Sequence, residues 1–249
     1  ALKNGDDAVA ALGIDDPIID IAVNPDRGYA LSIRGAAREL ASALKVSFKD
    51  PADSSLSGNL KIQGSSKPIA VVIDELDGAD LIFLRTLESV NPNKPAPVWM
   101  QRRIQKCGMR SISIAVDITN YVMLELGQPL HAFDSDKISG KIRVQGAGKF
   151  SKIKTLDGVE RNLNKDDLLI TDDKNALAIA GTMGGLDSEV TAETKRITIE
   201  AAHFSALAVA KNSRHHILSS EASRRFERGV DPALAEIASA RAAQLLIEL

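Results

Sequence analysis

The sequence has little cysteine, few aromatic residues and no excess of positive charge. Cys107 is the single cysteine, which excludes an internal disulfide, and no CxxC pair is present to hold zinc or an iron–sulfur cluster. One Trp, two Tyr and six Phe argue against a module that stacks rings along a single nucleic-acid strand. Because the net charge is −2, any contact with nucleic acid has to be local.

Long apolar runs are also missing. No stretch approaches the roughly 20 residues that a membrane span needs, and residues 1–7 lack the apolar core of a signal peptide. We therefore expect a soluble, cytoplasmic protein with no membrane partner. The chain opens on Ala1 and closes inside a helical pattern without a terminating glycine, so we also expect a piece of a longer polypeptide.

What is present is an ordinary globular composition, 44% hydrophobic and 26% charged, in which helical and strand patterns alternate. The apolar run at 18–23 predicts a strand, Ser32 is typical of the cap of a helix that ends near Leu44, and the turn formers at 49–67 predict a loop. Further elements are expected as strands at 69–74 and 81–90, helices at 98–107 and 113–127, short strands at 142–144, 152–156, 168–171, 176–180 and 196–202, and helices that start at Ser205 and Asp231. This succession predicts the α+β class, with mixed sheets and flanking helices.

Several short motifs favour plain structural roles. The run 146–149 starts like a nucleotide-binding loop, but the third glycine of GxGxxG is absent and no GxxxxGK[ST] occurs, so we predict a turn and no ATP chemistry here. His215 and His216 are adjacent and would point about 100° apart on a helix. We therefore predict that they lie on a solvated face and cannot converge on one metal ion. Ser220 precedes a helical run and is predicted to cap it.

Three other signals leave two interpretations open. One face of the predicted strand at 196–202 carries Glu200, which is ordinary if that face is solvated and a specificity group if it lines a pocket, because an unpaired buried carboxylate is costly. His131 follows a helix stop in a loop stiffened by Pro129, and is either a structural hydrogen-bonding group or a functional imidazole. The glycines of 181–185 either form a tight turn or let the backbone approach a ligand closely.

In combination, several blocks resemble one known family. Residues 116–134 closely resemble the beta subunit of bacterial phenylalanyl-tRNA synthetase, and so do 155–158, 180–185, 188–190 and 221–232 in the family's order, with 26–39 extending the match. The resemblance implies the module that edits mischarged tRNA, an α+β unit of two interwoven subdomains. It divides the chain into a first part of this module at 1–96, an editing core at 97–232, and a helix at 233–249 that leads into the next module.

By motif position, the resemblance implies an editing pocket at Pro129, His131, Gly184, Gly185, Glu200, Ser220 and Ala222. Its reaction would be hydrolysis of tyrosine wrongly esterified to tRNA(Phe). His131 would orient the adenosine hydroxyl or the water, with a general-base role left open, and main-chain N–H groups near Gly184 and Gly185 would receive the developing negative charge. Glu200, as a charged carboxylate, would accept the phenol proton and favour tyrosine by about 1.5–3 kcal/mol. The family often has threonine at the position of Ser220, so the missing methyl leaves slightly more room.

The same resemblance implies the partners. They are the acceptor end of tRNA(Phe) and the synthetase alpha subunit, whereas ATP and Mg are expected only in the parent enzyme and no cofactor or metal in this chain. An alternative from another class is a non-catalytic scaffold that orients tRNA and joins the subunits, and a third is a free-standing deacylase. Basic residues that fit either tRNA contact or a solvated helix face are Arg102, Arg103, Lys106, Arg110, Lys211, Arg214, Arg224, Arg225 and Arg228.

Overall fold

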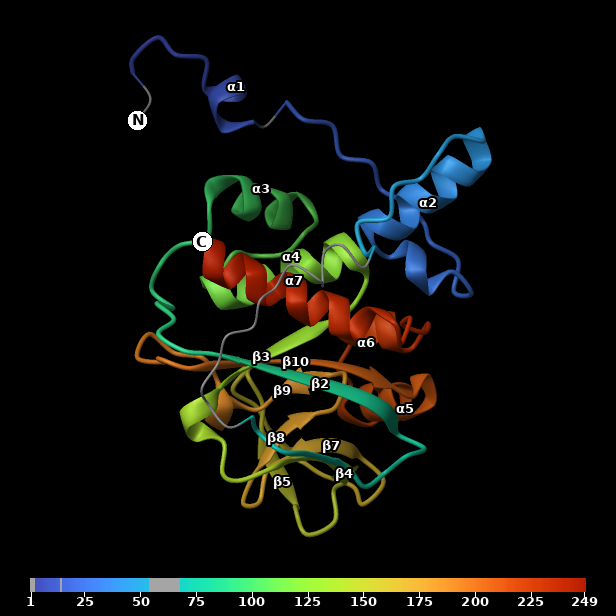
Figure 1. Ribbon diagram of the computed structural model, residues 1–249, viewed down its shortest axis with the longest axis vertical. Helices are drawn as coiled ribbons and strands as arrows, with labels where there is room; N and C mark the ends of the chain where they lie inside the picture. The colour runs from blue at the N-terminus through green and yellow to red at the C-terminus, as the bar shows by residue number, and fades with distance from the viewer. Residues whose placement is uncertain (1–2, 14, 54–67) are drawn as a thin grey trace.

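The computed structural model describes residues 3–13, 15–53 and 68–249 and confirms the predicted α+β class (Figure 1). A three-stranded antiparallel sheet lies at the centre, in the order β2-β10-β3. Its strands are Ala79–Leu87 (β2), Ile197–Phe204 (β10) and Leu130–Asp134 (β3). Both faces of this sheet are covered, so all residues of the middle strand β10 are buried except the half-buried His203.

Helices α4 (Ile114–Leu126) and α7 (Leu234–Glu248) cover one face of the central sheet, and α3 (Val98–Lys106) packs against α4 (Figure 1). Ile197 and Ile199 alternate along β10 and point into this helical layer, where both are fully buried. The period-two pattern of the strand therefore fixes which residues of β10 face the helices and which, including Glu200, face the other way.

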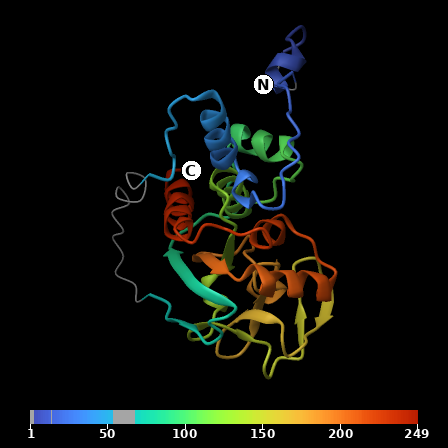
Figure 2. The same cartoon turned by 90° about the vertical axis from the view of Figure 1, so that its right-hand side faces the viewer.

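The other face of the central sheet packs on a five-stranded mixed sheet, in the order β1-β4-β7-β8-β9. Its strands are Val71–Ile73 (β1), Ile142–Gly146 (β4), Leu168–Thr171 (β7), Ala176–Ile179 (β8) and Met183–Gly184 (β9). Strands β1 and β4 are parallel, and the remaining neighbours are antiparallel. Two further strands, Lys152–Lys154 (β5) and Glu160–Asn162 (β6), form a separate hairpin, and helices α5 (Ala206–His216) and α6 (Glu221–Phe226) lie beside the sheets (Figure 2).

Three helices begin at the predicted serine caps, whereas α7 begins at Leu234 and not at the predicted Asp231. The Ser32 hydroxyl accepts the Gly35 N–H at the start of α2 (Ile33–Leu44), and Ser113 and Ser205 do the same for α4 and α5. Gly127 ends α4 with a left-handed φ of 95°, a conformation that glycine adopts at little cost. Local side-chain chemistry is thus sufficient to place these ends.

The strand predicted at 18–23 is wrong. The segment 15–23 forms no strand, and Ile18, Ile19 and Ile21 are 66%, 81% and 59% exposed. Within the described residues no other strand pairs with it, and an extended segment without a partner leaves its backbone groups unpaired. The predicted loop holds at 49–53, which has no regular structure, and its remaining part, 54–67, lies outside the described residues.

Three short strands were not predicted. The most important is β3, because His131 was expected in a loop and instead lies within this strand. Strands β6 and β9 are three and two residues long and carry too little pattern to stand out in the sequence. The predicted division of the chain into 1–96, 97–232 and 233–249 stays a prediction. Elements from all three ranges pack together, namely β2, β10 and α7.

Candidate functional site

A cavity of about 70 Å³ lies where β3 and β10 of the central sheet face β8 and β9, beside α6. It has room for several water molecules. The predicted site residues in its wall are Pro129, His131, Gly184, Glu200 and Ala222. The structure therefore brings together residues that are up to 93 positions apart in the sequence, since Pro129 and Ala222 line the same space.

Glu200 and His131 are direct partners across β10 and β3. Opposite residues on neighbouring antiparallel strands point to the same face with their Cβ atoms about 4.5–5.5 Å apart. Glu200 is only 5% exposed, and within the described part of the chain its carboxyl has no hydrogen bond or ion pair. His131 Nε2 is likewise buried without a hydrogen-bond partner there. Of the two interpretations of Glu200, the one in which its face lines a pocket is confirmed.

Burial decides the charge of both groups. It raises the pKa of Glu200 to about 8 and lowers the pKa of His131 to about 4. Between these two values the cavity holds a protonated carboxyl and a neutral imidazole. The expectation of a charged Glu200 therefore does not hold at pH 7 for the protein alone, because removing a carboxylate from water without a partner favours its neutral form.

Gly184 makes room for the imidazole. A Cβ at this position would overlap the His131 ring and would lie 2.9 Å from Leu156 Cδ1. Gly184 sits in the short strand β9, and its carbonyl accepts the Leu156 N–H at 3.0 Å. The turn before it contains Gly181, whose φ of 65° is left-handed. The turn is confirmed at Gly181, and Gly184 lets the backbone pass close to the His131 ring, while a close approach to a ligand stays a prediction.

Gly185 and Ser220 stand just behind the cavity wall. The Gly185 N–H donates to the Leu177 carbonyl at 2.7 Å, so it is not free to receive negative charge, contrary to the expectation for this residue. Ser220 caps α6 as predicted: its hydroxyl accepts the Ser223 N–H at 3.0 Å and donates to the Thr182 carbonyl at 2.9 Å. Ser220 therefore holds α6 against the segment that carries Thr182.

Some lining residues were not singled out from the sequence. Thr182 lines the cavity from the β8–β9 connection, Met183 from β9, and Phe204 and Phe226 from β10 and α6. Thr182, Met183 and Phe226 lie in two of the blocks that carry the family resemblance, 180–185 and 221–232, and could have been found there. Phe204 lies outside these blocks, and no sequence motif marks it. Phe204 and Phe226 meet edge to face at 5.1 Å between ring centroids, which gives the cavity an apolar wall.

The basic residues mostly serve the fold. Arg225, 4% exposed, donates to the Leu31 carbonyl and pairs with Glu221, and Arg228 donates to the Val23 carbonyl. Arg102 likewise donates to the Ala11 carbonyl. The expectation of a solvated face is wrong for Arg225, because these groups fasten the N-terminal segment to the rest of the molecule.

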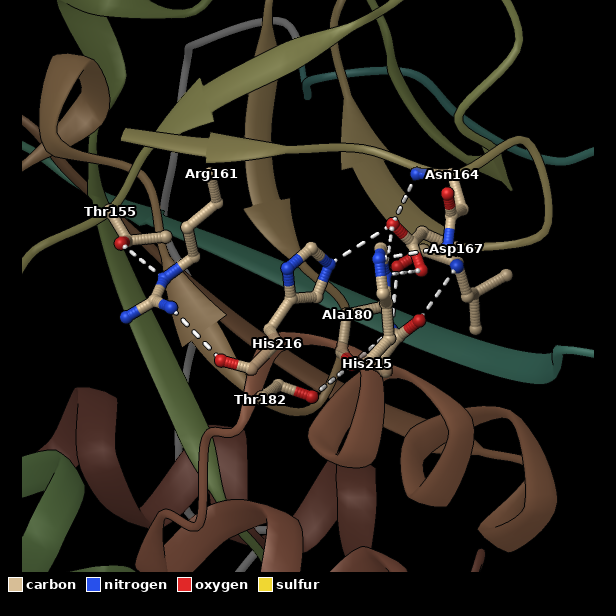
Figure 3. Close-up of polar contacts among 10 residues, drawn as sticks. Thr155, Arg161, Asn164, Asp167, Ala180, Thr182, His215 and His216 are labelled. Carbon is tan, nitrogen blue, oxygen red and sulfur yellow. Dashed lines mark hydrogen bonds and ion pairs between the residues drawn. The ribbon is translucent and has the colours of Figure 1, made fainter. Parts of the chain in front are cut away.

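His215 is exposed, as predicted, but the prediction of a solvated face is wrong for His216, and the prediction that the two rings cannot converge is wrong for both. Both rings contact the carboxylate of Asp167, and His216 is buried rather than solvated (Figure 3). This cluster lies outside the cavity described above.

Comparison with known proteins agrees with this arrangement. A family model described as the B3/4 domain matches residues 78–249, a range that contains every predicted site residue. The phenylalanine–tRNA ligase beta subunit of Streptomyces avermitilis is 48% identical over 252 residues, which cover 98% of this chain and 29% of that protein. That of Bifidobacterium longum is 47% identical over 265 residues, covering 99% and 30%. The chain thus spans about 30% of the length of these relatives.

Among solved structures, an N-terminal fragment of the phenylalanyl-tRNA synthetase beta subunit from Pyrococcus horikoshii matches with a TM-score of 0.44 and 16% identity, covering 80% of this chain and 60% of that one. Within the described residues, no helix has the length and apolar character needed to cross a membrane. The family match takes in more than half of the sequence, and the identity to the ligase beta subunits extends along nearly all of it. The chain therefore belongs to the B3/4 domain family, in the form found in bacterial phenylalanine–tRNA ligase beta subunits.

Proposed function

We propose that this chain is the tRNA-editing module of a phenylalanine–tRNA ligase beta subunit and hydrolyses tyrosine esterified to tRNA(Phe) by attack of water. The observation that carries the proposal is the meeting of Glu200, His131 and Gly184 at one cavity. The partners in this proposal are the acceptor end of the tRNA and the alpha subunit. Aminoacylation, with its ATP and Mg, belongs to the parent enzyme.

A hydrolytic site of this kind is needed because binding energy alone separates tyrosine poorly from phenylalanine. Tyrosine is phenylalanine plus one hydroxyl, and a hydrophobic pocket rejects an isostere with an added hydroxyl by only about 10²-fold. Higher accuracy needs a second site that prefers the hydroxylated amino acid and hydrolyses its ester.

Glu200 supplies that preference. The cavity wall is largely apolar, with Ile170, Phe204 and Phe226 available to contact an aromatic ring, and Glu200 is its buried carboxyl. A phenol hydroxyl that hydrogen-bonds to this carboxyl satisfies a group that phenylalanine would leave unpaired. A neutral hydrogen bond contributes about 0.5–1.5 kcal/mol, and one to an ionised carboxylate about 1.5–3 kcal/mol.

His131 acts by positioning. A general base is most effective when its pKa lies near the working pH, and burial lowers the pKa of His131 to about 4, which makes it a weak base. Its buried Nε2 has no partner in the described residues and is available to hold a water molecule or an adenosine hydroxyl. The Ser220 hydroxyl is engaged in capping and does not line the cavity, so no covalent step is assigned to it.

The test is a time course of deacylation with tyrosyl-tRNA(Phe) and phenylalanyl-tRNA(Phe), run with the purified chain and with the alpha–beta heteromer. We expect both to hydrolyse the tyrosyl ester faster, and His131→Ala to slow this step. Binding of tRNA without any hydrolysis by the heteromer would favour the scaffold alternative. Undiminished deacylation by His131→Ala would remove the imidazole from the mechanism.

A further inference from the structure

Two imidazoles and a carboxylate meet at the end of α5 (Figure 3), and none of the three residues lines the editing cavity. His215 Nδ1 lies 2.9 Å from Asp167 Oδ1, and His216 Nε2 lies 3.0 Å from Asp167 Oδ2. Asp167 directly precedes β7, so the three side chains join the C-terminal end of a helix to the start of a strand.

Adjacent helical residues converge here because they use different ring atoms. His215 reaches the carboxylate with Nδ1, the nitrogen nearer its backbone, and His216 with the more distant Nε2. The two ring centroids are 4.3 Å apart at an interplanar angle of 49°. One nitrogen of each ring and one carboxylate oxygen thereby lie within 4.8 Å of one another.

We infer that Asp167, His215 and His216 bind a divalent transition metal ion of the zinc class. Zinc takes imidazole nitrogen and carboxylate oxygen at about 2.0–2.2 Å in a tetrahedron, which places neighbouring ligand atoms about 3.3 Å apart. A single oxygen, Asp167 Oδ2, lies 3.1 Å from His215 Nδ1 and 3.0 Å from His216 Nε2, so both contacts need to open by only a few tenths of an ångström. Two imidazoles suit zinc, nickel or cobalt, whereas magnesium and calcium prefer oxygen ligands alone.

Groups behind the three ligands hold them in place. The Asn164 side chain lies 2.8 Å from His215 Nε2, the ring nitrogen that faces away from the carboxylate. The amide atom at that distance is Asn164 Nδ2; rotating the amide by 180° places Oδ1 there instead, where it accepts the Nε2–H and leaves Nδ1 free for the metal. The Asn164 backbone N–H donates to Asp167 Oδ2 at 2.7 Å, and Arg161 donates to the His216 carbonyl at 3.0 Å.

The exposure of the three side chains gives a metal ion access to the cluster from solvent. The His215 side chain is 34% exposed, whereas those of Asp167 and His216 are 5% and 3% exposed, so solvent reaches the cluster at His215 and a water molecule completes the tetrahedron there.

The chain runs from His216 through three residues to Ser220, the cap of α6. A metal that clips α5 to the start of β7 therefore stabilises the approach to the editing cavity, and this holds whether or not the chain edits tRNA.

The experiment titrates the chain with ZnCl₂ by calorimetry and follows thermal unfolding, with Cys107→Ser as background because an exposed thiol also binds zinc. We expect one equivalent to bind and to raise the unfolding temperature. Co²⁺ at the same site gives the visible absorption of a four-coordinate ion. His215→Gln, at the most exposed ligand, weakens binding at least tenfold.

His203→Gln is the matched control. His203 Nδ1 lies 2.6 Å from Asp80 Oδ1, a histidine–aspartate pair without a second imidazole, and its loss leaves zinc binding unchanged. Equal binding by the His215→Gln and background chains overturns the inference. So does Co²⁺ that keeps its six-coordinate spectrum with the otherwise unaltered background chain, a result that does not depend on the folding of any ligand variant.

Discussion

The preference for tyrosine is expected to depend on pH through Glu200. With its pKa raised to about 8 by burial, this carboxyl is about 90% protonated at pH 7. Hydrogen bonding of a phenol to the neutral group gives about a 2- to 13-fold preference, and to the ionised group about 13- to 160-fold. The ratio of tyrosyl to phenylalanyl deacylation should therefore rise about tenfold as the pH passes from 6 to 9. Because a phenol that donates to the carboxylate favours its charged form, the rise occurs at or somewhat below pH 8.

The assay measures both deacylation rates at each pH and takes their ratio, which cancels the faster spontaneous hydrolysis of both esters in alkali. Glu200→Gln is the matched variant, since its amide has the same shape and does not ionise. We expect this variant to keep most of the preference at pH 7 and to show a flat ratio up to pH 9. A wild-type ratio that is flat across this range, or a variant ratio that rises with it, refutes the assignment of Glu200 as the tyrosine-recognising group.

Three further outcomes follow from the same geometry. Gly184→Ala should displace His131, slow deacylation and destabilise the fold by about 1–3 kcal/mol in urea unfolding, because its Cβ overlaps the imidazole. Ser220→Ala should cost about 0.5–2 kcal/mol through loss of the cap, and the same change at the exposed Ser219 should cost almost nothing; equal losses would contradict the capping role. Relative to wild type, Glu200→Gln should gain stability as the pH rises from 4.5 to 8, by up to about 1.4 kcal/mol per unit, because folded Glu200 holds its proton longer than unfolded Glu200; a constant difference would contradict this.

The fold was predictable where the signal is local. Ser32 and Ser113 begin helices because their hydroxyls satisfy free N–H groups within three residues, and Gly127 ends one because its φ is positive. The run 18–23 has an equally clear apolar pattern, yet a strand exists only where another strand pairs with it, and sequence pattern does not supply the partner.

The candidate site was predictable in membership and unpredictable in charge. Family resemblance named seven residues, of which Pro129, His131, Gly184, Glu200 and Ala222 line one cavity, whereas Gly185 and Ser220 do not. What the residue types did not reveal is that the strand pairing of Glu200 with His131 leaves the Glu200 carboxyl and His131 Nε2 buried without partners among the described residues, which reverses the ionisation expected of the carboxyl. The convergence of His215 and His216 on Asp167 was not predicted for a similar reason. It depends on which ring nitrogen each histidine uses, Nδ1 in His215 and Nε2 in His216, as well as on the direction of the helix backbone.

The opposed pKa shifts of Glu200 and His131 have a joint effect on stability. Lowering the pKa of His131 from 6.5 to about 4 makes its contribution to stability fall as the pH falls below 6.5, whereas raising that of Glu200 from 4.5 to about 8 makes its contribution fall as the pH rises above 4.5. Between pH 4.5 and 6.5 the two slopes oppose and cancel, and from pH 6.5 to 8 the Glu200 slope acts alone. A neutral pair therefore places no buried charge in the cavity at neutral pH, and it leaves the carboxyl free to ionise when a phenol binds to it.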